Sequence, residues 1–431
     1  MSSYRGKGGF AQGASQDMLQ WIRCWRRLAG AALIAMGLAP AAEPAFAQTR
    51  TANLQAATTD TRADFQRFVQ LLWPEARGRG VSRATFEAAF AGVAPDPKII
   101  ALSEKQSEFV RPIWDYLDNA VAATRVSKGQ QVADEWGRVL DAVEHAYQVP
   151  KGVVLGIWGM ETNFGRFTGG TYVIQALSTL AFVRYRGDFF RDELLVALQI
   201  LEERHVAASN MRGSWAGAMG QTQFMPSSFM KYAVDGDGDG RSDIWTSMPD
   251  ALASTANYLR QRGWRPGLPW GFEVELPRRF DFRNHRQGFA SWSRLGVRRV
   301  DRRQMPRSGE ATLFLPGGAR GPAFLVTENY TVIKTYNSSD AYALGVAHLG
   351  DRIYGGRPIE GDWPKSEPAL DKDQREEVQR RLTRLGFDAG EADGRFGSKT
   401  REAVRRFQLR RGLASDGYAN LAVLKELRAV R

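Results

Sequence analysis

The chain has 431 residues, of which 43% are hydrophobic and 25% charged, and this composition excludes a disordered chain. Its 59 Lys and Arg residues against 47 Asp and Glu give a net charge of +12, which points to an anionic partner: nucleic acid, a membrane surface or an acidic polymer. A single cysteine, Cys24, and four scattered histidines exclude a disulfide framework and a multi-cysteine or HExxH-type metal site.

Residues 1–47 have the three-part pattern of a secretory signal peptide. A basic start is followed by an uncharged stretch over 28–42, about 15 residues long against the ~20 that a membrane span needs, and then by the small-residue site Ala45-Phe46-Ala47. The alternative is an uncleaved amphipathic anchor. Cys24 precedes the apolar stretch, so the pattern predicts a periplasmic protein that is not a lipoprotein. Cleavage removes five basic and two acidic residues and leaves +9.

The remaining chain predicts a mainly α-helical fold. Residues 48–62 are polar and suggest a flexible leader, and helical periodicity begins at Asp64. A first domain over 63–355 has helical patterns at 116–124, 132–147, 173–182, 192–205, 249–262 and 341–353. Within it, residues 264–332 predict a small β-rich insertion, with strands at 272–275, 312–315 and 324–326. A Gly- and Pro-rich linker at 356–370 precedes a helical unit at 371–431 with three apolar stripes and 15 basic residues against 10 acidic ones.

A carboxylate on an apolar helix face is the strongest chemical signal. In VPKGVVLGIWGMETNFG, residues 149–165, helical spacing places Glu161 on one face with Val154, Ile157 and Trp158. Burial and the negative end of the helix dipole would both raise the pKa of Glu161. A carboxylic acid that stays protonated near neutral pH is what general-acid cleavage of a glycosidic bond needs. The alternative is a solvated or ion-paired Glu, which periodicity alone does not exclude.

A second segment, MRGSWAGAMGQTQFMPS at residues 211–227, combines three glycines with Ser214, Gln221 and Gln223 among apolar neighbours. Small residues allow a ligand to approach the backbone, and amides supply paired donors and acceptors. The alternative is a tightly packed turn without a ligand.

These segments, together with KTYNSSDAYALGVAHLGDRI at residues 334–353, resemble the lytic murein transglycosylase B family, three motifs in order over most of 63–355. The resemblance implies a lysozyme-like α+β catalytic domain that cleaves the MurNAc–GlcNAc β-1,4 bond of peptidoglycan and leaves 1,6-anhydro-MurNAc ends. It assigns Glu161 as the single catalytic acid and base, with the substrate's N-acetyl group stabilising the positive centre. The polar stretches at 211–227 and 334–343 offer no second carboxylate except Asp340, whereas ordinary glycosidases use two.

The resemblance also implies substrate-binding residues. Ser214 matches a residue that orients the acid or the N-acetyl group, and Gln223 matches a substrate-contacting amide. Sugar-contacting and cleft positions match Tyr336, Asn337, Tyr116, Tyr258 and Tyr342. Phe189 stands where the family often has a further tyrosine, so one polar contact is in doubt.

An aspartate-rich loop follows the second segment. Asp235, Asp237, Asp239, Gly240 and Asp243 give D-x-D-x-D-G-x-x-D, most of an EF-hand calcium loop. Thr246 stands where a bidentate Glu is expected, and the family resemblance implies closure by Asp250, with Arg241 contributing its backbone carbonyl. The prediction is a structural calcium ion and no organic cofactor; the alternative is a metal-free surface turn.

Residues 371–431 are similar to the three-helix peptidoglycan-binding module of wall hydrolases. The expected partners are glycan strands and stem peptides, with cell-wall synthesis or division proteins as further candidates and no nucleic acid, because no aromatic–basic motif occurs. Two other readings stay open: a non-catalytic peptidoglycan-binding protein, and a muramidase that uses water.

Overall fold

The computed structural model describes the backbone of residues 45–105 and 112–430, and the side chains of residues 61–104 and 112–430. The chain divides into two units, residues 1–60 and 61–431, and the contacts described below lie in the second. The predicted signal peptide, residues 1–47, lies almost entirely outside the described residues. Among the described residues, no helix is long and apolar enough to cross a membrane.

The first described helix begins earlier than the sequence predicts. Helix α2 spans Ala45–Gly78, so it runs through residues 48–62, for which we expected a flexible leader. Eight of the fifteen residues at 48–62 are alanine, glutamine, arginine or leucine, which are good helix formers, and the helix contains neither glycine nor proline before Pro74. The prediction of a flexible leader was therefore wrong, because a polar composition is compatible with a helix.

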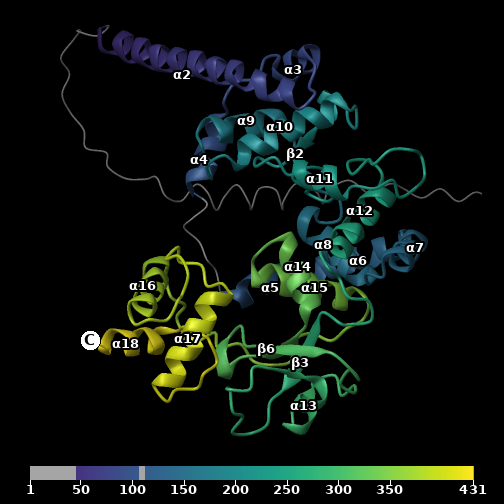
Figure 1. Ribbon diagram of the computed structural model, residues 1–431, viewed down its shortest axis with the longest axis vertical. Helices are drawn as coiled ribbons and strands as arrows, with labels where there is room; N and C mark the ends of the chain where they lie inside the picture. Colours follow the sequence, from purple (N-terminus) through teal and green to yellow (C-terminus); the bar gives the residue numbers. More distant parts are fainter. Residues whose placement is uncertain (1–44, 106–111, 431) are drawn as a thin grey trace, which may run out of the picture. The chain divides into compact units, whose positions relative to one another are not determined.

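A helical core makes up most of the rest of the first domain (Figure 1). Its helices are α3 (Arg83–Phe90), α4 (Pro97–Lys105), α5 (Ile113–Ala120), α6 (Ala123–Glu135), α7 (Gly137–Tyr147), α8 (Lys151–Thr162), α9 (Val173–Phe182), α10 (Phe189–Glu202), α11 (Pro226–Tyr232), α12 (Met248–Gln261), α14 (Glu328–Tyr336) and α15 (Asp340–Ile353). A 3₁₀ turn, η1 (Ala208–Asn210), and an antiparallel pair, β1 (Thr171–Tyr172) with β2 (Arg212–Gly213), complete it. These helices bury a continuous apolar core.

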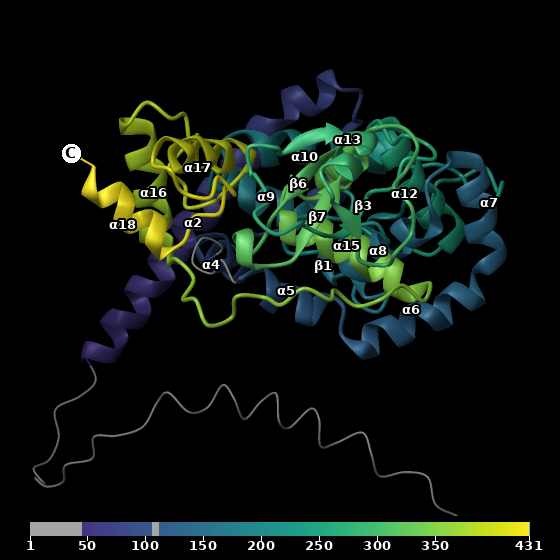
Figure 2. The same cartoon turned by 90° about the horizontal axis from the view of Figure 1, so that it is seen from below.

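Helices α8 and α15 pack side by side at the centre of this core, as Figure 2 shows. Glycines lie where the two helices touch. A Cβ atom added to Gly156 would lie 2.2 Å from the backbone oxygen of Val346. One added to Gly350 would lie 2.2 Å from the backbone oxygen of Gly152. The two backbones therefore touch, and no side chain fits between them at either point.

The β-rich insertion is a separate layer with its own core. A five-stranded antiparallel sheet has the order β4-β6-β7-β3-β5, formed by β3 (Gly271–Glu275), β4 (Arg286–Gly288), β5 (Arg298–Arg299), β6 (Glu310–Phe314) and β7 (Ala323–Val326). Helix α13 (Phe289–Arg294) and the turn η2 (Gly318–Arg320) connect its strands. Phe289 and Trp292 of α13 pack against the apolar side chains of the sheet.

The C-terminal unit consists of α16 (Lys372–Arg384), α17 (Ser398–Arg410) and α18 (Leu421–Ala429). A capping box, in which Asp371 and Gln374 each accept a backbone N–H of the other, starts α16. Val378, Leu382, Phe407 and Leu424 of the three predicted stripes are buried together in one core. The predicted fold class, a mainly helical lysozyme-like domain with a small sheet and a helical C-terminal module, is confirmed.

The contact between α8 and α15 gives a first prediction. We expect Gly156→Ala to lower the free energy of unfolding by about 1–3 kcal/mol or more, because the added methyl group must push two backbones apart. Thermal unfolding measures the effect. Gly137→Ala is the control: Gly137 also lies in a helix, but nothing lies within 4 Å of an added Cβ atom there, so better helix propensity should leave stability equal or higher. Equal melting temperatures for Gly156→Ala and the wild type would contradict tight packing.

Candidate functional site

Glu161 lies in the last turn of α8, at the end of its buried face. Residues 153–159 of this helix are all buried, whereas Glu161 retains some accessible surface although protein surrounds it on almost every side. The helix ends at Asn163, which adopts a left-handed conformation with φ of 50° and accepts a hydrogen bond from Arg125 Nε at 3.3 Å. The acid is thus held by a rigid apolar helix and a fixed helix end.

Tyr342 of α15 is the direct partner of this carboxyl group. Its hydroxyl donates to Glu161 Oε1 at 2.5 Å, and its side chain is 4% exposed. Burial raises the pKa of Glu161 to about 7, while the bond from Tyr342 acts in the opposite direction because it favours the ionised form. Glu161 is therefore partly protonated at neutral pH, the state that a general acid requires.

Two further tyrosines lie within the electrostatic reach of Glu161. Burial first, and then the charge of Glu161, raises the pKa of Tyr116 on α5 to about 12. The same two causes raise the pKa of Tyr336, at the end of α14, whose hydroxyl donates to the Thr222 backbone oxygen at 2.7 Å. All three tyrosine hydroxyls therefore stay protonated, and those of Tyr342 and Tyr336 already donate their single hydrogen to Glu161 and to the Thr222 backbone oxygen.

Tyr258 on α12 packs against this group of tyrosines. Its ring packs edge-on against Tyr336 with centroids 4.8 Å apart, and its hydroxyl donates to the Thr335 backbone oxygen at 2.6 Å. Only 4% of the residue is exposed. The structure thus gives Tyr258 a positioning contact, where the family resemblance implied a cleft residue.

Ser214 and Gln223 are tied into the loop between β2 and α11. Ser214 Oγ accepts the backbone N–H groups of Ala218 at 3.0 Å and Ala216 at 3.3 Å. Gln223 Nε2 donates to the Gly220 and Thr168 backbone oxygens at 2.9 and 3.0 Å. Among the described residues neither side chain hydrogen-bonds to Glu161. Both are partly exposed, so each keeps capacity for a ligand.

Two other predicted positions are also solvent-accessible. Asn337 is exposed, and its side-chain oxygen accepts the Ser339 N–H at 3.2 Å just before α15 begins. Phe189, at the start of α10, is 43% exposed and contacts Phe190 edge-on. The structure shows no contact between either residue and Glu161.

Sequence reasoning assigned no role to the residues that join the acid helix to the glycine-rich loop. The side-chain oxygen of Gln221 accepts the Trp158 indole N–H at 3.0 Å, and its amide group donates to the Trp245 backbone oxygen at 3.4 Å. Gln221 is 9% exposed, so this bond lies inside the core. An amide among glycines and apolar residues was the available signal, but only the fold identifies its partner.

Asp340, the one carboxylate within residues 211–227 and 334–343, is already paired. It forms ion pairs with Lys334 at 2.7 Å and with Arg401 of α17, and its side chain is 14% exposed. No described carboxylate contributes to the raised pKa of Glu161, which has only burial and Tyr342 as causes. The described site therefore holds a single free carboxylic acid.

The aspartate-rich loop brings three carboxylates together. Oxygens of Asp235, Asp237 and Asp250 lie within 4.8 Å of one another. Such a set of hard oxygen donors fits a divalent cation like calcium. Asp239 and Asp243 are not part of this group; Asp239 accepts the N–H of Arg241, and Asp243 accepts those of Trp245 and Thr246. Asp250 accepts the N–H groups of Gly236 and Asp243, and thus joins the start of α12 to the loop.

Comparison with known proteins identifies the class to which this helical domain and its carboxylic acid belong. Residues 64–351 match the Transglycosylase SLT domain, and residues 371–427 match the putative peptidoglycan binding domain. Because the first match spans more than half of the chain, the chain belongs to the SLT transglycosylase family.

Three relatives agree with this assignment. Membrane-bound lytic murein transglycosylase B of Escherichia coli (strain K12) is 34% identical over 237 residues, which cover 51% of this chain and 62% of the relative, so the chain spans less than two thirds of that protein. SltB3 from Pseudomonas aeruginosa in complex with NAG-anhNAM-pentapeptide is 45% identical, with a TM-score of 0.79 over 85% of this chain and 99% of the other. Escherichia coli Slt35 in complex with calcium is 27% identical, with a TM-score of 0.56 over 68% and 92%.

The bond from Tyr342 gives a second prediction. An activity that needs protonated Glu161 is lost as the pH rises through its pKa of about 7. Tyr342→Phe removes a bond that favours the ionised form, so the pKa should rise and the alkaline limb of the pH–rate profile should move up. A hydrogen bond to a charged group is worth about 1.5–3 kcal/mol, which corresponds to about one to two pH units.

Tyr336→Phe is the matched control, because the Tyr336 hydroxyl donates to a backbone oxygen and not to Glu161. We expect its alkaline limb to stay at the wild-type pH, whatever its rate. An unshifted limb in Tyr342→Phe would show that this bond does not set the pKa of the acid.

Proposed function

We propose that this chain is a lytic transglycosylase that cleaves the β-1,4 bond between MurNAc and GlcNAc of peptidoglycan and forms 1,6-anhydro-MurNAc ends. The observation that carries the proposal is a single free carboxylic acid, Glu161, with a pKa raised to about 7 and with no second carboxylate among the described residues that affects it. One acid suffices for this reaction because the same residue gives and then takes back a proton.

In the first half of the reaction, Glu161 donates its proton to the glycosidic oxygen, the C1–O bond breaks, and the GlcNAc end leaves as an alcohol. The N-acetyl oxygen of the substrate stabilises the positive C1 centre. In the second half, Glu161, now ionised, takes the proton of the MurNAc C6 hydroxyl, whose oxygen bonds to C1. The acid is regenerated and no water is consumed. The Tyr342 hydroxyl stabilises the carboxylate between the two halves.

The water-using muramidase and the non-catalytic binding protein fit the site less well. Hydrolysis with inversion or through a covalent intermediate needs a second carboxylate near the acid, and Asp340 is held in two ion pairs. A protein that only binds glycan has no need of an acid enclosed by protein, because burying a carboxyl group costs free energy that binding does not recover. The single acid thus disfavours two-carboxylate hydrolysis and a purely binding role, and the products separate the lyase from hydrolysis assisted by the substrate's N-acetyl group.

Removing the acid tests this proposal. We expect Glu161→Gln to fold and to lose at least ~10²-fold of its activity on purified sacculi, as the loss of a general acid implies. Glu135→Gln, an exposed position on α6, is the control and should keep full activity. Mass spectrometry of wild-type products should find anhydro ends. Products heavier by one water would indicate hydrolysis, and undiminished clearing by Glu161→Gln would rule out the assigned acid.

We also infer that Asp235, Asp237 and Asp250 bind a structural calcium ion. Three carboxylates at this distance repel one another, and a cation would relieve the repulsion; the relative Slt35 was crystallised in complex with calcium. Burial raises the pKa of Asp250 first of all, and the charge of Asp237 adds to it. The ion would fix the loop that follows Gln223 to α12. Asp239, Asp243 and the Arg241 carbonyl remain predicted ligands, which would have to exchange their present loop contacts for the ion.

Calcium binding predicts a stability change. A ligand present at about 100 times its dissociation constant stabilises a fold by ~2.7 kcal/mol, so calcium should raise the melting temperature of metal-free protein by several degrees. Asp237→Asn should reduce this shift, whereas Asp134→Asn, an exposed position on α6, should keep it. If calcium leaves the metal-free wild type unchanged, the loop does not bind the ion with useful affinity.

The remaining features suggest where the enzyme works. We propose that residues 1–47 direct export to the periplasm through a cleaved signal peptide without lipid attachment, since the peptidoglycan substrate lies there. The module at residues 371–427 would hold the enzyme on glycan strands or stem peptides. Cell-wall synthesis or division proteins remain candidate partners.

A further inference from the structure

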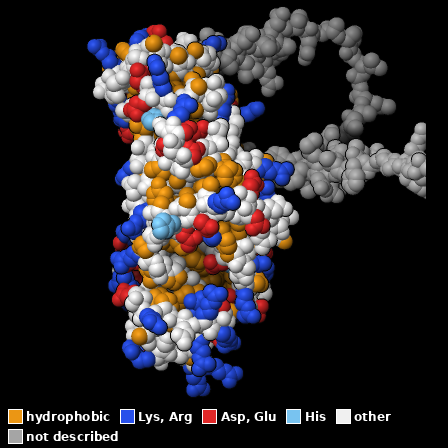
Figure 3. Space-filling model, turned by 90° about the vertical axis from the view of Figure 1, so that its right-hand side faces the viewer, with side chains coloured by type: hydrophobic (Ala, Val, Ile, Leu, Met, Phe, Trp, Pro, Cys, Tyr) orange, Lys and Arg blue, Asp and Glu red, His pale blue; other side chains and the backbone are white. Residues whose placement is uncertain are grey.

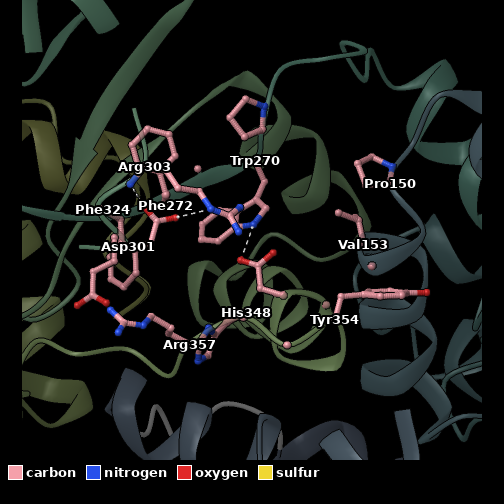
Figure 4. A pocket seen from close by; sticks show the side chains of 18 of the residues that line it. Pro150, Val153, Trp270, Phe272, Asp301, Arg303, Phe324, His348, Tyr354 and Arg357 are labelled. Atoms are coloured by element: carbon pink, nitrogen blue, oxygen red, sulfur yellow. Dashed lines mark hydrogen bonds and ion pairs between the residues drawn. The ribbon is translucent and has the colours of Figure 1, made fainter. Parts of the chain in front are cut away.

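A cavity of about 810 Å³ lies at the opposite end of α8 from Glu161. Its walls come from the first turn of α8, from the end of α15 with residues 354–359, and from β3, β5 and β7 of the insertion (Figure 4). None of the predicted catalytic, substrate-binding or metal residues lines it. Eleven helical steps separate Pro150 from Glu161, about 16 Å at 1.5 Å per residue. The cavity is therefore distinct from the catalytic site.

The aromatic side chains of this cavity are poorly placed for stacking on a sugar. Trp270 and Phe272 are each 7% exposed, and Phe324 is 2% exposed. Their rings are committed to the core beneath the cavity, while sugar stacking needs an open ring face. Tyr354 is 45% exposed, but Lys151 Nζ already lies 5.4 Å from the centre of its ring. Charged groups consequently decide what the cavity can hold.

Asp351, in the last turn of α15, is the most exposed acid of the cavity floor. Its Oδ2 atom accepts the Trp270 indole N–H at 3.1 Å, and no described residue donates to Oδ1. The side chain is open to the cavity, yet the surrounding protein raises its pKa to about 6 through poor solvation. Above that pH Asp351 is an ionised carboxylate with an unused acceptor in a poorly hydrated space, a suitable partner for an ammonium group.

Arginines lie on one side of this carboxylate. Figure 4 shows Arg303 and Arg357 at one end of the cavity, with Pro150, Val153 and Tyr354 at the other. The Arg303 and Arg357 side chains are 80% and 65% exposed, and each has one acidic neighbour, Asp301 at 3.8 Å and Glu360 at 2.8 Å. A guanidinium group with free N–H donors binds carboxylates well.

The wider surface agrees with this arrangement. Residues 264–332 contain twelve arginines, no lysine and six acidic residues. Figure 3 shows basic side chains gathered at the lower end of the visible face, the end at which Figure 1 places the insertion. The insertion as a whole is basic, but the charged residues that it gives to the cavity wall, two acids and two arginines, balance, so any attraction for an anion there comes from the exposed Arg303 together with Arg357, whereas Asp351 on the core side attracts a cation.

We propose that this cavity is a second binding site, which takes the zwitterionic end of a peptidoglycan stem peptide, with the ammonium group on Asp351 and the carboxylate on Arg303 and Arg357. The proposal rests on the proposed function, since it takes peptidoglycan to be the substrate. A peptide held here would fix a piece of wall about 16 Å from the acid, and would direct cleavage towards glycan that carries peptides.

Calorimetric titration tests the site without any cleavage. The protein is the full chain carrying Glu161→Gln, and the probe is a synthetic stem pentapeptide with a free side-chain amine. We expect Asp351→Asn, which keeps an acceptor for Trp270, to weaken peptide binding at least tenfold. Arg303→Gln should weaken it as well, and because that side chain is 80% exposed this variant does not depend on how the cavity folds. Asp281→Asn, an exposed insertion residue outside the cavity, should bind like the parent.

Chemical changes in the probe complete the test. Acetylating the amine of the peptide should weaken its binding to the parent protein as much as Asp351→Asn weakens binding of the unmodified peptide. The Asp351→Asn variant should bind the acetylated and the unmodified peptide equally well. Unchanged peptide affinity in both Asp351→Asn and Arg303→Gln would overturn the proposal, as would displacement of the peptide by peptide-free glycan. Failure of the proposed function would look different, because it would appear as missing anhydro products from the wild type while the titration stayed intact.

Discussion

The backbone contact between α8 and α15 is the constraint on which both ends of the core depend. Because Gly156 and Gly350 let the two helices touch, their side chains meet at fixed positions along the shared axis. At one end this brings Tyr342 within 2.5 Å of Glu161. At the other it places Asp351 beside the start of α8, where the insertion closes a cavity. A wider spacing between the helices would break the hydrogen bond from Tyr342 to Glu161. The glycines at the helix contact therefore control the position of the acid although they do not contact it.

Enclosing a carboxyl group has a cost that depends on pH. The pKa of Glu161 in the folded chain, about 7, exceeds its ordinary value of 4.5. Below pH 4.5 both the folded and the unfolded chain hold the proton, so the enclosed acid costs no stability through ionisation. The cost grows as the pH rises from 4.5 to 7, and above 7 it is present in full. Tyr342 limits it by stabilising the ionised form. The fold is thus less stable at alkaline pH than it would be without the enclosed acid, but the acid stays partly protonated at neutral pH. The bond from Tyr342 determines the size of both effects, because it sets the pKa of Glu161.

Sequence periodicity predicted the elements with a clear apolar repeat, but it missed short strands and side-chain contacts that depend on residues distant in the sequence. The pattern at 173–182 coincides with α9, the strands expected at 272–275 and 324–326 lie in β3 and β7, and the one expected at 312–315 overlaps β6, which ends one residue earlier. One helix expected over 132–147 is two, divided at Trp136, because the apolar spacing continues across the break. Strands β4 and β5 are two or three residues long and exist only through their partners. Likewise, periodicity placed Glu161 on a buried face, but its partner lies 181 residues away, so only the fold, or a family resemblance, could bring Tyr342 to it.

The positive charge of the chain lies outside the core that holds Glu161. The predicted mature chain carries +9, and the C-terminal unit at 371–431 supplies +5 of it. The insertion at 264–332 supplies a further +6, which leaves −2 for the remainder of that chain. A cation close to Glu161 would favour its ionised form and lower its pKa. Among the described residues, no charged side chain contributes to the pKa of this acid, which burial and a neutral tyrosine determine. Positive charge can attract an anionic wall polymer from the insertion and the C-terminal unit without deprotonating the acid. The net charge of +12 is therefore informative only when it is assigned to separate parts of the chain. The insertion and the C-terminal unit are basic and can attract the polymer, whereas the core that holds the acid is not basic.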